Sequence, residues 1–292
     1  MSKVFYHSRN NEKIYMKLLY TFTFLFLIFG FYKNGISLYK EGYIGILDLF
    51  KPVFLYLISI VFSFAFSKLF KVYKNYRFLV NIIMALIVPQ NINYFVYIGT
   101  LVVINLLFKL IKLNPIGMGM GMIGFYSFLR KQFYFLNVKE LSVTSNYNFF
   151  DILIGKGVGG LSNTFLLLSI IVFFVLIMNI NYKKQIPIYG FLTYYVLLIL
   201  YSFISQNLDI NLFLNNNFIF SLIFILPISI YSPYSKGASI LFGIFIGVCS
   251  FGVSFVNLNF GIYLVIFVAT LLKDVFDKFI VSKSNNNLIE VL

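Results

Sequence analysis

Long apolar runs follow one another along most of this 292-residue chain, from Ile14 to Phe279, and short polar stretches separate them. Each run has about the 20 residues that a helix needs to cross a bilayer core about 30 Å thick. The apolar positions do not alternate with polar ones as they do in the strands of a membrane barrel, and helices are the other structure that satisfies the backbone in lipid. The pattern therefore predicts an all-α integral membrane protein.

We expect about ten transmembrane helices. Their approximate ranges are 14–32, 46–67, 78–90, 92–111, 117–136, 164–180, 186–205, 216–231, 237–256 and 260–279. Proline interrupts the third segment at Pro89 and the eighth at Pro227 and Pro233.

The two halves of the chain, 14–136 and 164–279, have the same plan: two spans, a short proline-broken segment, and two more spans. An odd number of spans per half makes the second half run inverted, and broken segments at matching positions of inverted repeats point to a binding site near the middle of the membrane. Prolines in ordinary loops between helices would give the same spacing.

The distribution of charge predicts how the chain is oriented in the membrane. The chain is 60% apolar and 11% charged, so we expect one membrane domain over residues 1–292, divided into repeat one (14–136), an external loop (137–163), repeat two (164–279) and a cytoplasmic tail (280–292). The net charge of +14 fits topology-setting loops and anionic lipid better than nucleic acid. Of the 23 Lys and Arg residues, 16 fall on the side of the N-terminus, so both termini should be cytoplasmic. The remaining seven are Lys33, Lys40, Lys51, Arg130, Lys131, Lys139 and Lys156.

The residue types that build metal and catalytic centres are scarce. Cys249 lies inside an apolar run and His7 in the N-terminal tail, so this chain alone is not expected to form a metal site. No Ser/His/Asp set, carboxylate pair or phosphate-binding loop of the Walker type is present, and no acidic residue falls clearly in mid-membrane. We therefore predict no catalytic residue.

Four polar interruptions remain as candidate sites: 114–121, 141–145, 151–164 and 227–237. The glycines of the first permit close helix packing, which we favour over ligand contact. The second offers three hydroxyls in a loop. The third is a glycine-rich turn with Lys156 before the sixth span; it would suit an anion, or it is a flexible re-entrant turn. The fourth carries prolines and hydroxyls at membrane depth, where irregular backbone needs protein or a cavity around it.

In this order and spacing the four segments resemble one family over most of the chain: the flavin-bearing membrane subunits of Rnf electron-transport complexes and of the sodium-translocating NADH:quinone reductase (Nqr). Gly261 through Asp277 also follows the family's last helix without a gap. The matching residues are Asn114, Pro115 and Met120 in the family's Asn-Pro-Phe-Asn-Pro-Ala-Met; Asp151, Gly155, Gly159 and Thr164 in its glycine-rich loop; and Ser232, Pro233, Lys236, Gly237, Gly243 and Gly247 in its Ser-Pro and Lys-Gly region.

The resemblance implies ten helices in two inverted five-helix repeats, as in ammonium and urea channels, within the bacterial inner (cytoplasmic) membrane. It implies FMN joined to a threonine outside the membrane, here Thr144, with a second flavin as a further option, and other membrane subunits of the complex and the lipid bilayer as partners. The cofactor-binding positions that it suggests beyond Thr144 are Asn114, Pro115, Gly155, Gly159, Thr164 and Ser232.

Departures from the family pattern keep a second function open. Leu141, Ser142 and Val143 replace Ser-Gly-Ala before Thr144, and Asn163 replaces the family's glutamate. The leading hypothesis is a membrane subunit that passes electrons through flavin, coupled to Na⁺ or H⁺ movement. The alternatives are a small-solute or flavin transporter or channel that keeps the fold without redox activity, and a structural scaffold for partner subunits.

Overall fold

The computed structural model describes residues 9–69, 74–110, 114–129, 149–156, 159–206, 210–228 and 230–289. Within these ranges all regular structure is helical and no strand is present, which confirms the predicted all-α class. Four helical stretches are long and apolar enough to cross a membrane, and several shorter apolar helices accompany them, so the protein is a helical membrane protein. The four are Glu12–Lys40, Lys51–Leu69, Gln185–Ser205 and Lys236–Ser254.

The elements from α1 to α7 form a first group. They are α1 (Arg9–Phe31), the π-helical segment η1 (Tyr32–Ser37), α2 (Leu38–Lys40), α3 (Ile46–Leu49), α4 (Lys51–Leu69), α5 (Lys74–Ile87), α6 (Tyr94–Leu110) and α7 (Pro115–Leu129).

A second group follows the short helix α8 (Phe149–Leu153). It consists of α9 (Leu166–Ile177), α10 (Gln185–Ser205), α11 (Ile210–Phe213), α12 (Asn216–Phe220), the π-helical segment η2 (Ser221–Ile225), α13 (Lys236–Ser254) and α14 (Gly261–Ile289).

Three of the ten expected spans are short helices. Helix α5 has 14 residues, about the length of the expected segment 78–90, whereas α9, with 12 residues, and α12 with η2, with five each, are shorter than the segments expected over 164–180 and 216–231. At a rise of about 1.5 Å per residue they reach only about 15–21 Å, less than the bilayer core. The segment expected over 216–231 ends its helix at Ile225 because Pro227 follows and cannot donate a backbone hydrogen bond. The prediction of ten complete spans is therefore not confirmed.

Polar residues at the helix starts explain several boundaries. The Asn215 side chain accepts a hydrogen bond from the Phe218 N–H (3.1 Å), and Ser235 caps α13 by accepting one from the Ala238 N–H (3.1 Å). Asn114 precedes Pro115, the first residue of α7, and its Oδ1 accepts from the Ile116 N–H (3.0 Å). These caps satisfy backbone groups that a helix leaves without partners at its N-terminus.

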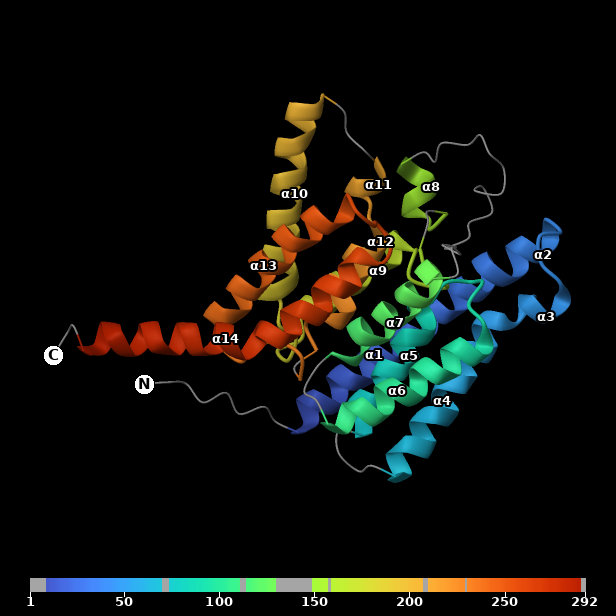
Figure 1. Cartoon of the computed structure of the whole chain (residues 1–292), viewed down its shortest axis with the longest axis horizontal. Helices are drawn as coiled ribbons and strands as arrows, with labels where there is room; N and C mark the ends of the chain where they lie inside the picture. Colours follow the sequence, from blue (N-terminus) through green and yellow to red (C-terminus); the bar gives the residue numbers. More distant parts are fainter. Residues whose placement is uncertain are drawn as a thin grey trace.

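The two groups lie on opposite sides of the molecule and meet along several helices (Figure 1). Helix α4 packs on α5, α10 on α13, and α13 on α14, while α7 packs against α14 across the groups. Gly117 makes the last contact close, since a Cβ there would lie 2.9 Å from both the Tyr263 carbonyl oxygen and the Phe267 nitrogen. Beyond this contact α14 extends away from the body of the molecule (Figure 1).

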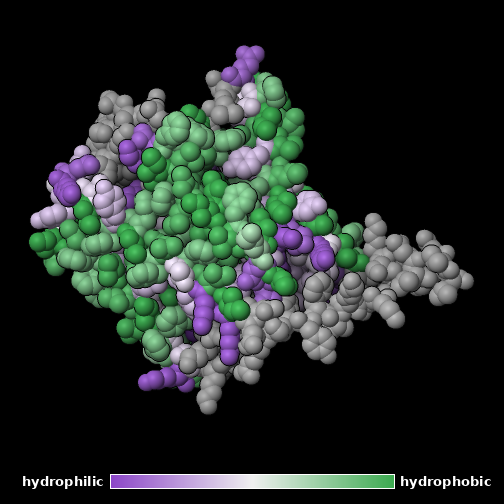
Figure 2. Space-filling view, turned by 180° about the vertical axis from the view of Figure 1, so that it is seen from behind, coloured by the Kyte–Doolittle hydropathy of each residue, from purple (hydrophilic) through white to green (hydrophobic). Residues whose placement is uncertain are grey.

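The surface supports a membrane location. Hydrophobic residues cover most of the face in Figure 2, and hydrophilic residues gather mainly toward its margins. Large apolar side chains such as Phe64, Phe174 and Phe203 are exposed on α4, α9 and α10. In a soluble protein such an extensive apolar surface would drive association, whereas in a bilayer it faces lipid.

Candidate functional site

The glycine-rich turn before α9 is buried against the end of α5. The N–H of Leu161 donates to the Val88 carbonyl (2.9 Å), and the N–H of Ser162 donates to the Leu86 carbonyl (2.8 Å). These carbonyls lack helical partners because α5 stops before Pro89. Gly160 allows the approach, because a Cβ there would lie only 2.2 Å from the Ile87 carbonyl oxygen. Residues 159–164 therefore form a buried turn that packs on the end of α5, and both interpretations of its role stay predictions.

The π-helical segment η1 fastens the same turn from the other side. Its wider turn places the three consecutive residues Lys33, Asn34 and Gly35 in the interior. The Lys33 ammonium donates to the Thr164 hydroxyl (2.8 Å), and the Asn34 amide donates to the Leu161 carbonyl. Lys33 belonged to the expected external side of the chain, and its inward position depends on the π-helical turn, which no periodicity in the sequence indicates.

Next to Thr164, a buried group of amide and hydroxyl side chains joins three parts of the chain. Asn163 Nδ2 donates to Asn217 Oδ1 (2.6 Å), and the Tyr263 hydroxyl donates to the same oxygen (3.3 Å). Asn217 Nδ2 in turn donates to Asn259 Oδ1 (3.2 Å). One further polar atom of this group, Asn163 Oδ1, is buried without a hydrogen-bond partner among the described residues. The group can therefore still hydrogen-bond a polar ligand.

Two further predicted site residues, Asn114 and Ser232, lie near positions of α14 that are further along the helix than Tyr263. Asn114 contacts α14 at Thr270, whose Oγ1 accepts from the Asn114 N–H (3.4 Å). Thr270 is seven residues from Tyr263, or about 10 Å along the helix. The Asn114 Nδ2 is buried and has no partner among the described residues.

Ser232 lies in the break between η2 and α13, whose contact with α14 is further from Tyr263 than the contact of Asn114. Its neighbours Tyr234 and Ser235 donate backbone hydrogen bonds to Asp277, 14 residues or about 21 Å from Tyr263. The Lys183 ammonium donates to the Ser232 and Pro233 carbonyls (3.2 and 2.7 Å).

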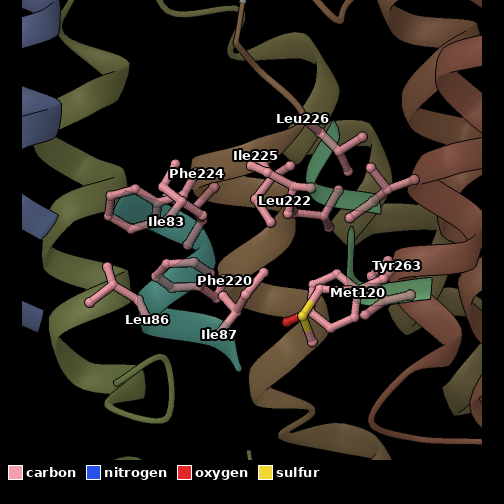
Figure 3. Packing of buried hydrophobic residues seen from close by; sticks show 14 of the residues in the cluster. Ile83, Leu86, Ile87, Met120, Phe220, Leu222, Phe224, Ile225, Leu226 and Tyr263 are labelled. Carbon is pink, nitrogen blue, oxygen red and sulfur yellow. The ribbon is translucent and has the colours of Figure 1, made fainter. Parts of the chain in front are cut away.

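An apolar layer lies between the amide group at Asn163 and the break that contains Ser232. Figure 3 shows Phe220 and Phe224 beside Ile83 and Ile87 of α5. The rings of Phe220 and Phe224 stack with centroids 4.7 Å apart, and both rings meet Phe26 of α1 edge-on. The side chains of this layer are fully buried and closely packed, so they separate the Asn163 group from the polar groups around Ser232.

The predicted cofactor-binding residues therefore do not converge on one pocket. Gly159 and Thr164 lie together, since a Cβ on Gly159 would be 2.5 Å from Thr164 Cγ2. Asn114, which precedes Pro115, contacts α14 at Thr270, and Ser232 lies in the break whose residues Tyr234 and Ser235 contact Asp277. Gly155 has a left-handed backbone (φ +97°) and lies against Phe29. Thr144, the predicted FMN attachment site, lies outside the described residues.

The cation expected in the glycine-rich turn has another role. Lys156 forms an ion pair with Asp151 (2.8 Å), five residues earlier in the chain. The lysine that contacts Thr164 is Lys33. Sequence reasoning also missed Asn217 and Lys183, because single Asn and Lys residues are frequent in this chain and carry no spacing signal.

No group of three or more His, Cys, Asp or Glu side chains that could hold a metal ion occurs within the described residues. Comparison with family models finds none that matches this chain, and no curated protein matches it either.

Proposed function

We propose that this protein is a membrane subunit of an ion-translocating electron-transport complex of the Rnf/Nqr type. It would hold flavin and pass electrons between partner subunits in the bacterial inner membrane, with both termini cytoplasmic and with ten membrane segments in two inverted five-helix halves. The flavin would supply the redox chemistry, and this chain would supply its position and its local electrostatics.

One observation carries the proposal: three of the four segments that resemble the family, 114–121, 151–164 and 227–237, each contact the last helix, α14, although more than 100 residues separate the first from the last. Gly117 packs on the α14 backbone, Asn163 lies 3.5 Å from the Tyr263 hydroxyl, and Tyr234 donates to Asp277 (2.9 Å). Segments that resemble a family in their order and spacing, and that also meet at one helix, are expected when the resemblance reflects a common three-dimensional framework.

The order of the elements supports the inverted-repeat part of the proposal. A short third helix followed by a break occurs in each group: α5 before residues 88–93, and α12 with η2 before residues 226–235. The fourth elements, α6 and α13, and the fifth, α7 and α14, follow in the same order, and the two fifth helices pack together. In transporters built from inverted repeats, the two repeats meet at the interface that holds the substrate site.

A transporter or channel without redox activity is the second candidate. The buried amide group favours it: Asn163 stands where the family has a glutamate, and its Oδ1 has no hydrogen-bond partner among the described residues. A polar and partly unsatisfied group without a carboxylate suits an uncharged solute better than a proton relay.

Ion uptake into native membrane vesicles distinguishes the two functions. Deleting the gene should abolish ion uptake driven by a reduced electron donor, and the intact gene should restore it. Uptake of an uncharged solute that needs this protein but no electron donor would support the transporter instead.

A further inference from the structure

The two helix breaks are fastened to the rest of the protein in different ways. At the break after α5, the groups that bind the break itself are uncharged: the Leu161 and Ser162 N–H groups donate to the Val88 and Leu86 carbonyls, and Gln90 Nε2 donates to the Asn34 carbonyl (3.0 Å). The Lys33 ammonium contacts Thr164, at the other end of the turn that packs there. At the second break, between η2 and α13, charged side chains bind the backbone of the break directly.

Three charged side chains from two elements bind the backbone of the second break. Lys183, in the connection between α9 and α10, donates to the Ser232 and Pro233 carbonyls (3.2 and 2.7 Å). Lys273 of α14 donates to the Ile230 carbonyl (2.7 Å). Asp277, one turn further along α14, accepts from the Tyr234 and Ser235 N–H groups (2.9 and 3.0 Å).

These contacts match the polarity of the backbone on the α13 side of the break. The lysines meet the carbonyls of Ile230, Ser232 and Pro233, and the carboxylate meets N–H groups at the start of α13, where the helix dipole favours negative charge. The Lys183 ammonium also lies 5.5 Å from the centre of the Tyr234 ring, a cation–π distance. Hydrogen bonds to charged groups are worth roughly twice those between neutral ones.

We infer that Lys183, Lys273 and Asp277 form a latch that holds the backbone of the second break, residues 230–235, against α14 and the α9–α10 connection, and that this break is the movable one of the two. Release of the latch frees this turn from both elements, while the first break stays fixed by its backbone and amide hydrogen bonds. The inference rests on these contacts and does not depend on flavin or on electron transport.

Ser239 offers a reporter of latch opening. It lies in the first turn of α13, is only 3% exposed, and its Oγ donates to the Ser235 carbonyl (2.9 Å). In a Cys249→Ala background, Ser239→Cys supplies the single cysteine, and the rate of maleimide labelling of the purified protein at constant neutral pH measures exposure of this position.

Lys183→Met should accelerate this labelling at least about tenfold, because the methionine keeps most of the side-chain volume but cannot bind the carbonyls. Lys184→Met is the matched control, since the neighbouring Lys184 is exposed, and it should label as slowly as the parent. Lys183→Arg keeps the charge and should also label slowly.

Labelling of Lys183→Met at the parent rate would overturn the latch, as would equal acceleration by Lys184→Met. If Lys183→Met does not yield a monodisperse protein, the isosteric Asp277→Asn carries the test: it should label faster than the parent, and an unchanged rate there would likewise overturn the inference.

Discussion

Gly160 provides the sharpest test of how the glycine-rich turn is fastened. In Gly160→Ala the new Cβ would lie 2.2 Å from the Ile87 carbonyl oxygen and 2.5 Å from its carbon. Both atoms belong to the backbone of α5, so no side-chain rotation relieves the clash, and the turn must move away from the helix.

The cost follows from the two hydrogen bonds that this movement breaks. The Leu161 and Ser162 N–H groups donate to the Val88 and Leu86 carbonyls at 2.9 and 2.8 Å, in a buried region. Leaving a buried polar group unsatisfied costs about 1–3 kcal/mol, so we expect a loss of about 2–6 kcal/mol. At about 2 °C per kcal/mol for a large chain, that is a decrease in Tm of about 4–12 °C.

The single cysteine makes the measurement simple. Cys249 is partly buried in α13, and its reaction with a thiol-sensitive dye during heating at a fixed scan rate reports unfolding. Gly121→Ala is the matched control, because a Cβ at this exposed helical position meets no atom within 4 Å and alanine favours the helix by about 0.5–1 kcal/mol. If Gly160→Ala melts at or above the Tm of the parent, the packing of residues 159–164 on α5 is wrong.

Three further predictions address topology, the ligand site and pH. With both termini cytoplasmic, a cysteine at Ser145 should react with an impermeant reagent from outside and one at Ser284 only from inside; external reaction at Ser284 would reject the topology. Gly159→Leu should insert and purify like the parent but retain less flavin, because the added side chain meets Thr164; unchanged flavin content would make the turn purely structural. Burial lowers the pKa of Lys183 from 10.5 to about 8. The charge of Lys273 on α14 lowers this pKa further, and the charge of Asp277 on α14 raises it. The Tyr234 ring faces the ammonium from the break. Between about pH 8 and 10 the unfolded chain therefore holds more protons than the folded protein, so the Tm of the parent should rise relative to that of Lys183→Met across this window, and a relative fall would contradict the burial of this ammonium.

Much of the helical framework follows from the hydrophobic pattern. The expected span 186–205 agrees with α10 within one residue, and the expected start of the last helix at 260 agrees with α14, which begins at Gly261. Apolar periodicity and proline positions determine such boundaries locally.

What the pattern could not supply depends on tertiary contacts. The inward rotation of Lys33 requires a π-helical turn, and the burial of residues 159–164 requires the free carbonyls of α5. Asn163 and Asn217 meet only through folding, 54 residues apart in the chain. Asn and Lys are common in this sequence, and nothing in their spacing separates these side chains from exposed ones.

Covalent flavin is the most direct test of the proposed function. The protein should be coexpressed with a flavin transferase, separated under denaturing conditions and examined for flavin fluorescence in the gel, with Thr144→Ala and the neighbouring Ser145→Ala as the paired variants. The proposal predicts a fluorescent band in the parent and in Ser145→Ala, and none in Thr144→Ala. A parent protein without fluorescence, although the transferase labels a known substrate in the same cells, would contradict it.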